Sequence, residues 1–248
     1  IKVYIILMKI ALIQLGDKEY AAENIGCLHL NSLYCEKYGY SHIVESLNFP
    51  DIEATYQKPY ILLKYMHDFD YVIWADLDSA IINHEIKLED IINSYSDKDY
   101  LIFKDPGNWD FNAGILVFKN CLSNTKLLWQ WWNMCPKVPH PEWRKVGGDQ
   151  ELLHQLLESK GPIDSLPAKI MNQHPKNFIA GDFLIHFMGY FSEDVKTHMC
   201  FLVGQNKDSE WNGRYLEAFG KIHPTITDRL EGNHLDTIKP EEIVNLML

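Results

Sequence analysis

The sequence predicts an α/β protein, a three-layer αβα sandwich with a mostly parallel central sheet. Short apolar runs alternate with amphipathic segments over about 160 residues, as in strands joined by crossover helices. One run, Tyr71-Val-Ile-Trp-Ala75, is typical of a strand buried on both faces. It leads directly into Asp76-Leu-Asp78, so two carboxylates are expected at the carboxyl edge of the sheet, where open α/β sheets bind ligands.

The first part of the sheet is predicted from the N-terminal runs. Residues 9–15 form the first expected strand, closed by Gly16-Asp17, and residues 41–44 form the second. Between them we expect one helix that ends near Gly39, because glycine adopts the left-handed conformation found after helices. The face of that helix toward the sheet is expected to hold Ala21, Ile25, Leu28, Ser32 and Cys35.

The remaining elements continue the alternation. Lys58-Pro59 opens a helix over residues 58–66, since proline is tolerated in a first helical turn. Further helices are expected over residues 86–92, 125–135 and 149–159, and further strands over residues 100–103 and 114–118. From residue 221 the chain turns polar. We therefore expect one domain over residues 1–220 and an arm over residues 221–248 that packs on it or joins another domain.

Composition limits the classes of partner. The chain has 248 residues, 46% of them hydrophobic, which supports one large domain with a substantial core. Its formal net charge is −11 and it has no dense Lys/Arg run, which argues against nucleic acid or an anionic membrane as the main partner. Residues 1–13 are too short and too charged for a membrane span, and no signal-type cleavage site follows.

Asp76 and Asp78 suit a hard divalent cation, Mg²⁺ or Mn²⁺, that clamps a phosphate-bearing substrate. Residues two apart on a strand lie about 7 Å from each other, too far to share one ion unless the chain bends after Asp76. We therefore expect Asp78 to bind the metal directly and Asp76 to act through a water molecule or a ribose hydroxyl. The alternative is a strand-end turn in which both side chains cap backbone groups. Two other tripeptides, Asp68-Phe-Asp70 and Asp97-Lys-Asp99, are expected in solvated loops.

Three later motifs carry polar side chains. Asn112-Ala-Gly114 predicts a small-residue turn before a strand, where the Asn112 amide or the backbone can approach a sugar; a plain structural turn is the alternative. Asp149 and Gln150 follow a Gly-Gly pair and either cap a helix or face a pocket. His186 ends an apolar run, where a hydrogen-bonded core histidine is the ordinary interpretation unless it converges with the acidic pair.

The order of these motifs resembles the GT-A glycosyltransferases. Lys58-Pro59 precedes the strand into Asp-x-Asp, and Phe-Asn-Ala-Gly, Gly-Asp-Gln and His-Phe-x-Gly follow in turn. The resemblance spans residues 9–189 and is strongest to the galactosyl/xylosyl/mannosyltransferase group, which includes plant xyloglucan xylosyltransferases and yeast α-mannosyl- and α-galactosyltransferases. It implies the GT-A (Rossmann-like) fold and a metal site in which Asp76 lies near the ribose and phosphates, Asp78 binds Mn²⁺ or Mg²⁺, and His186 completes the set.

The resemblance also implies where the donor and acceptor bind. Gln14, Gly16 and Asp17, at the end of the first strand, would cradle the nucleotide base, and Lys58 would reach the donor. The residues implied on the sugar and acceptor side are Asn112, Asp149 and Gln150.

The implied reaction moves a hexose, pentose or deoxyhexose from a nucleotide-diphosphate sugar, UDP-linked, to a glycan hydroxyl. The resemblance favours retention of configuration. Inversion would need a carboxylate base near the acceptor, for which Asp149 and Glu151 are candidates. Trp109 and Tyr190 can stack on sugar faces, although such aromatic residues are more often core or rim residues.

Two departures from the family and two rival functions accompany this interpretation. Eukaryotic relatives carry a membrane anchor and stem not seen here, and Trp-Ala-Asp-Leu-Asp stands where they have Leu-Asp-Ser-Asp. We therefore expect a soluble, cytoplasmic protein of a microbial cell or virus-infected host cell.

A haloacid-dehalogenase-type phosphatase also has a strand that ends in Asp-x-Asp. Such an enzyme needs a second acid in a later motif, and Gly181-Asp182 lacks it. The other rival is a catalytically inactive sugar-binding module.

Overall fold

A five-stranded sheet forms the centre of the protein. The computed structural model describes residues 8–105, 107, 109–136, 148–179 and 181–188. The strands of this sheet are β1 (Ile10–Leu15), β2 (Ser41–Glu45), β3 (Tyr71–Ala75), β5 (Tyr100–Phe103) and β6 (Asn112–Lys119), in the order β2-β1-β3-β6-β5. Only β6 runs against the others, because it is antiparallel to both β3 and β5. The expected mostly parallel sheet is confirmed.

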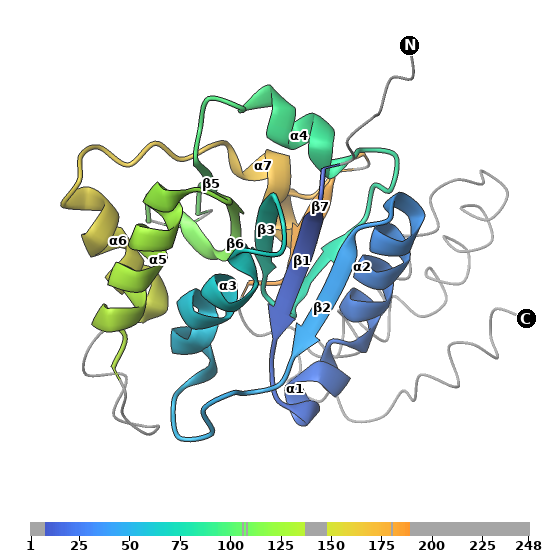
Figure 1. Cartoon of the computed structure of the whole chain (residues 1–248). Helices are drawn as coiled ribbons and strands as arrows, with labels where there is room; N and C mark the ends of the chain where they lie inside the picture. The colour runs from blue at the N-terminus through green and yellow to red at the C-terminus, as the bar shows by residue number, and fades with distance from the viewer. Residues whose placement is uncertain (1–7, 106, 108, 137–147, 180, 189–248) are drawn as a thin grey trace, which may run out of the picture.

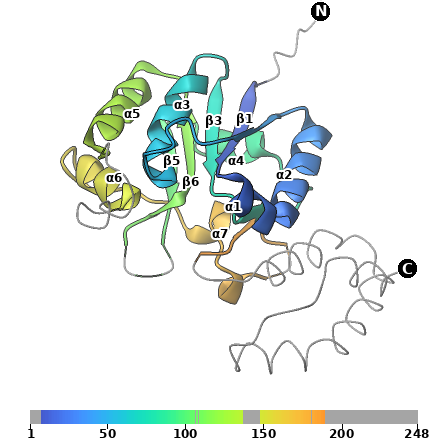
Figure 2. The same ribbon diagram turned by 90° about the horizontal axis from the view of Figure 1, so that it is seen from below.

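Helices cover both faces of the sheet (Figures 1 and 2). The helices are α1 (Lys18–Glu23), α2 (Ile25–Tyr38), α3 (Lys58–Met66), α4 (Leu88–Ser94), α5 (Leu122–Met134), α6 (Asp149–Glu158) and α7 (Ala168–Met171). One hydrophobic core packs α3, α5 and α6 against residues such as Ile13 and Trp74. A second core packs α2 and α4 against Leu12 and Ile73, which adjoin Ile13 and Trp74 along the same strands. Because adjacent strand residues enter opposite cores, the predicted three-layer arrangement is confirmed.

A second, two-stranded sheet was not expected from the sequence. It pairs β4 (Ser79–Ile81) with β7 (Leu184–His186) in antiparallel register. The expected turn at residues 112–114 is wrong, since Asn112 is already the first residue of β6. The other expected strands and helices begin and end within three residues of the observed ones, apart from the first helix.

The segment expected to be one helix before Gly39 is two helices. Asn24 separates α1 from α2, and its side-chain amide donates to the carbonyl of Tyr20 (2.8 Å). The buried face of α2 consists of Cys27, Leu30, Asn31, Tyr34 and Cys35. Of the expected face only Cys35 is fully buried, and Ile25 is 55% exposed, because the break resets the helical phase. Gly39 follows α2 with a φ of 74°, as expected.

Some expectations fall outside the described residues: the domain boundary at residue 220, the arm over residues 221–248, and Tyr190. Within the described residues, no helix combines the length and apolar character that crossing a membrane requires.

Candidate functional site

Asp76 and Asp78 lie in a tight turn that follows β3. The N–H of Ser79 donates to the carbonyl of Asp76 (3.0 Å), and Ser79 then begins β4. The chain therefore bends directly after Asp76, which removes the distance limit that an extended strand would impose on the two carboxylates. The N–H of Asp76 donates to the carbonyl of Gly114 on β6 (2.8 Å), which anchors the turn to the main sheet.

The small second sheet brings His186 to this turn. Ser79 lies opposite His186 in the β4–β7 pair, and the N–H of Phe187 donates to the carbonyl of Asp78 (2.9 Å). The Nε2 atom of His186 lies 3.3 Å from Asp78 Oδ1 and 3.9 Å from Asp76 Oδ2. One ligand atom from each of the three side chains lies within 4.8 Å of the other two. The structure thus brings His186 next to the acidic pair, the arrangement that the family resemblance implied.

The cluster of Asp76, Asp78 and His186 fits a divalent cation such as Mn²⁺ or Mg²⁺. Two carboxylates suit a hard cation and imidazole is a ligand of transition metals, so the set favours Mn²⁺ over Mg²⁺, and none of the three is a thiolate that would favour a softer metal. Asp76 presents Oδ2 to the cluster, while its Oδ1 accepts a hydrogen bond from the indole of Trp74 (2.7 Å). Within the described residues this is the one such group of His, Cys and acidic side chains. The other two Asp-x-Asp tripeptides lie at exposed turns, as expected.

Lys58, the first residue of α3, connects the acidic turn to α6. Its ammonium lies 3.0 Å from Asp76 Oδ1 and 2.9 Å from Asp149 Oδ2. It also donates to the carbonyl of Ala113 (3.1 Å). Burial by itself lowers the pKa of this ammonium, but the two carboxylates outweigh burial and raise the pKa of Lys58 above its ordinary 10.5. Lys58 is therefore a permanently charged link between the two carboxylates.

Asp149 is the first residue of α6, and its side chain points to Lys58 rather than capping the helix. Gly148 occupies the cap position and makes no side-chain cap. Burial raises the pKa of the Asp149 carboxyl above its ordinary 3.8, while the charge of Lys58 opposes that rise. Asp149 Oδ2 is shielded from solvent, and the ammonium of Lys58 at 2.9 Å is the cation that balances its charge.

Gln150 and Asn112 hold the start of β6 in place. Gln150 Oε1 accepts from the N–H of Ala113 (2.9 Å). Asn112 Oδ1 accepts from the N–H of Gly114 (2.8 Å), and the Asn112 amide donates to Asp105 (3.1 Å). The structure thus places both predicted residues around Ala113, whose carbonyl accepts from Lys58.

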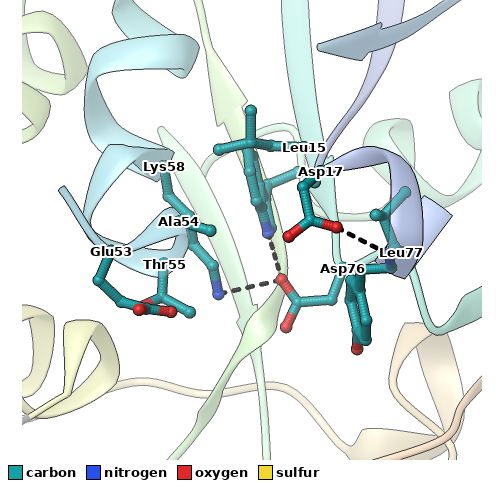
Figure 3. A pocket seen from close by; sticks show the side chains of 11 residues that line it. Leu15, Asp17, Glu53, Ala54, Thr55, Lys58, Asp76 and Leu77 are labelled. Atoms are coloured by element: carbon teal, nitrogen blue, oxygen red, sulfur yellow. Dashed lines mark hydrogen bonds and ion pairs between the residues drawn. The ribbon is translucent and has the colours of Figure 1, made fainter. Parts of the chain in front are cut away.

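A pocket of about 330 Å³ opens beside the acidic turn (Figure 3). Its lining comes from the β1–α1 connection, from the turn before α3 and from the end of β3: Leu15, Gly16, Asp17, Tyr20, Glu53, Ala54, Thr55, Lys58, Trp74, Asp76 and Leu77. Figure 3 shows Lys58 and Asp76 pointing toward one another there. Gly16, Asp17, Lys58 and Asp76, which were expected around a nucleotide donor, therefore share one pocket.

Gln14 was expected to cradle the nucleotide base, but it does not line the pocket and instead supports the acidic turn. Its side chain is fully buried. The Gln14 amide donates to the carbonyl of Asp76 (3.1 Å), and its Oε1 accepts from Asn31 (3.1 Å) and lies 2.8 Å from His42 Nε2. With these three partners Gln14 braces the turn that presents Asp76.

Trp109 is one of the two aromatic residues that could stack on a sugar, and it lies within the described part of the chain. It is 45% exposed. Its ring and the ring of His154 are inclined by 71°, with centroids 5.5 Å apart.

Comparison with known proteins bears on the fold. No protein-family model matches the chain, and no curated protein sequence matches it. Solved structures do match. A glycosyltransferase involved in the glycosylation of the major capsid of PBCV-1 superimposes with a TM-score of 0.62 at 14% identity, over 79% of this chain and 100% of that one. This chain has the GT-A fold.

Two further GT-A structures agree. The galactosyltransferase LgtC, solved with donor and acceptor sugar analogs, has a TM-score of 0.53 at 14% identity over 82% of this chain and 99% of LgtC. The bifunctional glycosyltransferase WbbM has a TM-score of 0.52 at 10% identity, over 87% of this chain and 52% of WbbM. At these identities the comparison establishes the GT-A fold alone.

Sequence reasoning missed three buried amides that support the GT-A site: Asn31, Gln57 and Asn172. Asn31, within α2, binds the carbonyl of Ser79 and the N–H of Ile81 and so holds β4. Asparagine is disfavoured in helix interiors, so its position in α2 was an available signal. Gln57 and Asn172 lie near helix ends, where polar residues are ordinary, and nothing in the local pattern marked them.

Proposed function

We propose that the protein is a metal-dependent glycosyltransferase that moves a sugar from a nucleotide-diphosphate sugar, UDP-linked, to a hydroxyl of a glycan, with retention of configuration. The observation that carries this proposal is the convergence of Asp76, Asp78 and His186 in a turn whose Asp76 also lines the pocket. The GT-A fold supports it, because the matched structures are named as glycosyltransferases.

The chain's own residues divide the work on the donor. Asp78, His186 and Oδ2 of Asp76 would hold Mn²⁺, which when bound supplies positive charge that stabilises the leaving diphosphate. Gly16 and Asp17 would contact the nucleoside in the pocket. Lys58 holds Asp76 in place through its ion pair, so Oδ2 stays directed toward the cluster.

The sugar would lie between the acidic turn and α6. Asp149, held by Lys58, would fix the start of α6 beside the sugar, and Gln150 and Asn112 set the position of the strand beneath it. A buried carboxylate held by Lys58 is poorly placed to receive a proton from a bulky acceptor, which favours retention over inversion. Trp109 would stack on the acceptor at the rim.

The proposed setting is a soluble protein of a microbial or virus-infected cell, with a transferase domain to residue 220 and an arm beyond it. Its proposed partners are the nucleotide sugar and the glycan acceptor.

The test measures release of UDP from a panel of UDP-sugars with and without Mn²⁺. We expect release that depends on Mn²⁺ and is lost in Asp78→Asn. Asp97→Asn, in an Asp-x-Asp tripeptide at an exposed turn, is the matched control and should release UDP as the wild type does. Phosphate release from sugar phosphates would instead support the phosphatase, and donor binding without release would support the sugar-binding module.

A further inference from the structure

The imidazole of His186 lies where a side chain at Gly114 would be. A Cβ atom built on Gly114 would lie 2.0 Å from Cε1 and 2.8 Å from Nε2 of His186, and also 2.8 Å from Asn112 Oδ1. These distances are far inside van der Waals contact, so any residue with a side chain at this position would displace the imidazole. Gly114 belongs to a buried strand and is not in a turn, and its role here is to leave room.

Hydrogen bonds hold the backbones of Gly114 and His186 in place, so neither can move away from the other. The carbonyl of Gly114 accepts from Asp76, and its N–H donates to Asn112 Oδ1 (both 2.8 Å). On the opposite side, the N–H of His186 donates to the carbonyl of Gln173 (2.9 Å), and β7 is paired with β4. A substituent at Gly114 would therefore move either the imidazole or the strand that anchors Asp76.

Asn172 fixes which nitrogen of His186 faces the acidic pair. The side-chain N–H₂ of Asn172 donates to the carbonyl of Lys104 (3.2 Å), so its oxygen must face the other way, toward His186 Nδ1 at 2.9 Å. An amide oxygen only accepts, hence Nδ1 carries a proton, and in the neutral imidazole Nε2 is left with the lone pair that faces Asp78. Both side chains are buried, which excludes competition from water.

We propose that Gly114 and Asn172 are positioning residues that prepare His186 as a nitrogen ligand of the metal site. This inference rests on the proposed function, because the ligand role of His186 does. Gly114 sets where the imidazole lies, and Asn172 sets which nitrogen it presents.

The first experiment measures Mn²⁺ binding, in the presence of UDP, by electron paramagnetic resonance of free and bound Mn²⁺. Gly114→Ala should weaken binding by about tenfold or more. Gly148→Ala is the matched control, since a Cβ there meets no atom within 4 Å, and it should bind as the wild type does. Unchanged binding in Gly114→Ala would overturn the proposal.

A double-mutant cycle on thermal stability tests the steric part without metal. Gly114→Ala should lower the Tm in the wild-type background but less in His186→Ala, because the nearest group that it meets is then absent while the contact with Asn112 Oδ1 remains in both backgrounds. An equal loss of Tm in both backgrounds would show that the imidazole is not what the glycine accommodates.

The third measurement tests Asn172. Asn172→Leu should weaken Mn²⁺ binding by about 10–100-fold, whereas Asn172→Asp keeps the acceptor oxygen but loses the N–H₂ that donates to Lys104, and should recover part of that loss. Nitrogen-15 NMR of His186 without metal should show the Nδ1–H tautomer in the wild type and lose that preference in Asn172→Leu. An Nε2–H tautomer in the wild type would contradict the role of Asn172.

If the wild type binds no Mn²⁺, the proposed function is wrong. The Tm cycle and the NMR spectrum would still decide whether Gly114 and Asn172 position His186.

Discussion

The ammonium of Lys58 lies 2.9 Å from a carboxylate oxygen of Asp149, and both side chains are buried. The pair joins the first residues of α3 and α6, two helices that pack into the same core. Since Lys58 also pairs with Asp76, one cation balances two carboxylates at the edge of the pocket. The stability of this part of the protein should therefore depend strongly on Lys58.

Lys58→Met should lower the free energy of unfolding by about 3–5 kcal/mol, because it leaves the buried carboxylate of Asp149 and the half-buried one of Asp76 without their cation. Urea denaturation at neutral pH measures the change. The control is Lys37→Met, which breaks an exposed ion pair with Glu85 and should alter stability little. Equal effects of the two substitutions would contradict the structural importance of the buried pair.

The raised pKa of Asp149 predicts a pH-dependent difference between the wild type and Asp149→Asn. In the wild type the folded state releases this proton at a higher pH than the unfolded state does, so Asp149 costs stability as pH rises above about 4 through the folded-state pKa. Asparagine does not titrate. The Tm of Asp149→Asn relative to wild type should therefore rise over this window and then level off, in melts from about pH 4 to about pH 8. A relative Tm that falls with rising pH would mean that Lys58 lowers the pKa of Asp149 more than burial raises it.

Local patterns were sufficient for the central part of the fold. The apolar run predicted β3 with its observed bounds, and the Lys58-Pro59 start predicted the whole of α3. Both elements are buried against neighbours on the sheet, so their hydrophobic residues follow the strand and helix periods. The place of His186 was different, since its apolar run alone indicated a core histidine and only the motif order resembling GT-A enzymes indicated the metal site.

The parts that could not be predicted depend on contacts distant in sequence. β4 and β7 have three residues each, too few for a periodic signal, and they form because Asn31 and the turn at Asp78 hold them. The break at Asn24 moved the buried face of α2, since a single residue between helices changes their phase. Gly114 read as a turn glycine because sequence does not reveal which side chain will approach it.

The side chain of Gln57 holds the segment that leads into the pocket lining at Glu53. Its Oε1 accepts from the N–H groups of Asn48 and Phe49, and its amide donates to the carbonyls of Phe49 and Ile52. Gln57→Leu would leave these buried groups unpaired, at a cost of about 1–3 kcal/mol for each group that water cannot reach. We expect faster amide hydrogen exchange over residues 48–55 and weaker UDP binding, because Glu53 and its neighbours line the pocket. Exchange that accelerates uniformly over the protein would mean that Gln57 supports the fold and not this segment in particular.

Gly16 controls the position of Leu77, the residue between the two site aspartates. A Cβ on Gly16 would lie 2.2 Å from Leu77 Cδ1, and Leu77 is only 1% exposed, so its side chain has little space to move. Gly16→Ala should cost about 1–3 kcal/mol through overpacking and should weaken UDP binding measured by calorimetry, because the displaced leucine disturbs the turn. Adding Leu77→Ala restores the missing space, so the double variant should lose no further stability relative to Leu77→Ala alone. If Gly16→Ala weakens UDP binding equally in both backgrounds, the methyl group blocks the nucleotide directly and Leu77 is not the intermediary.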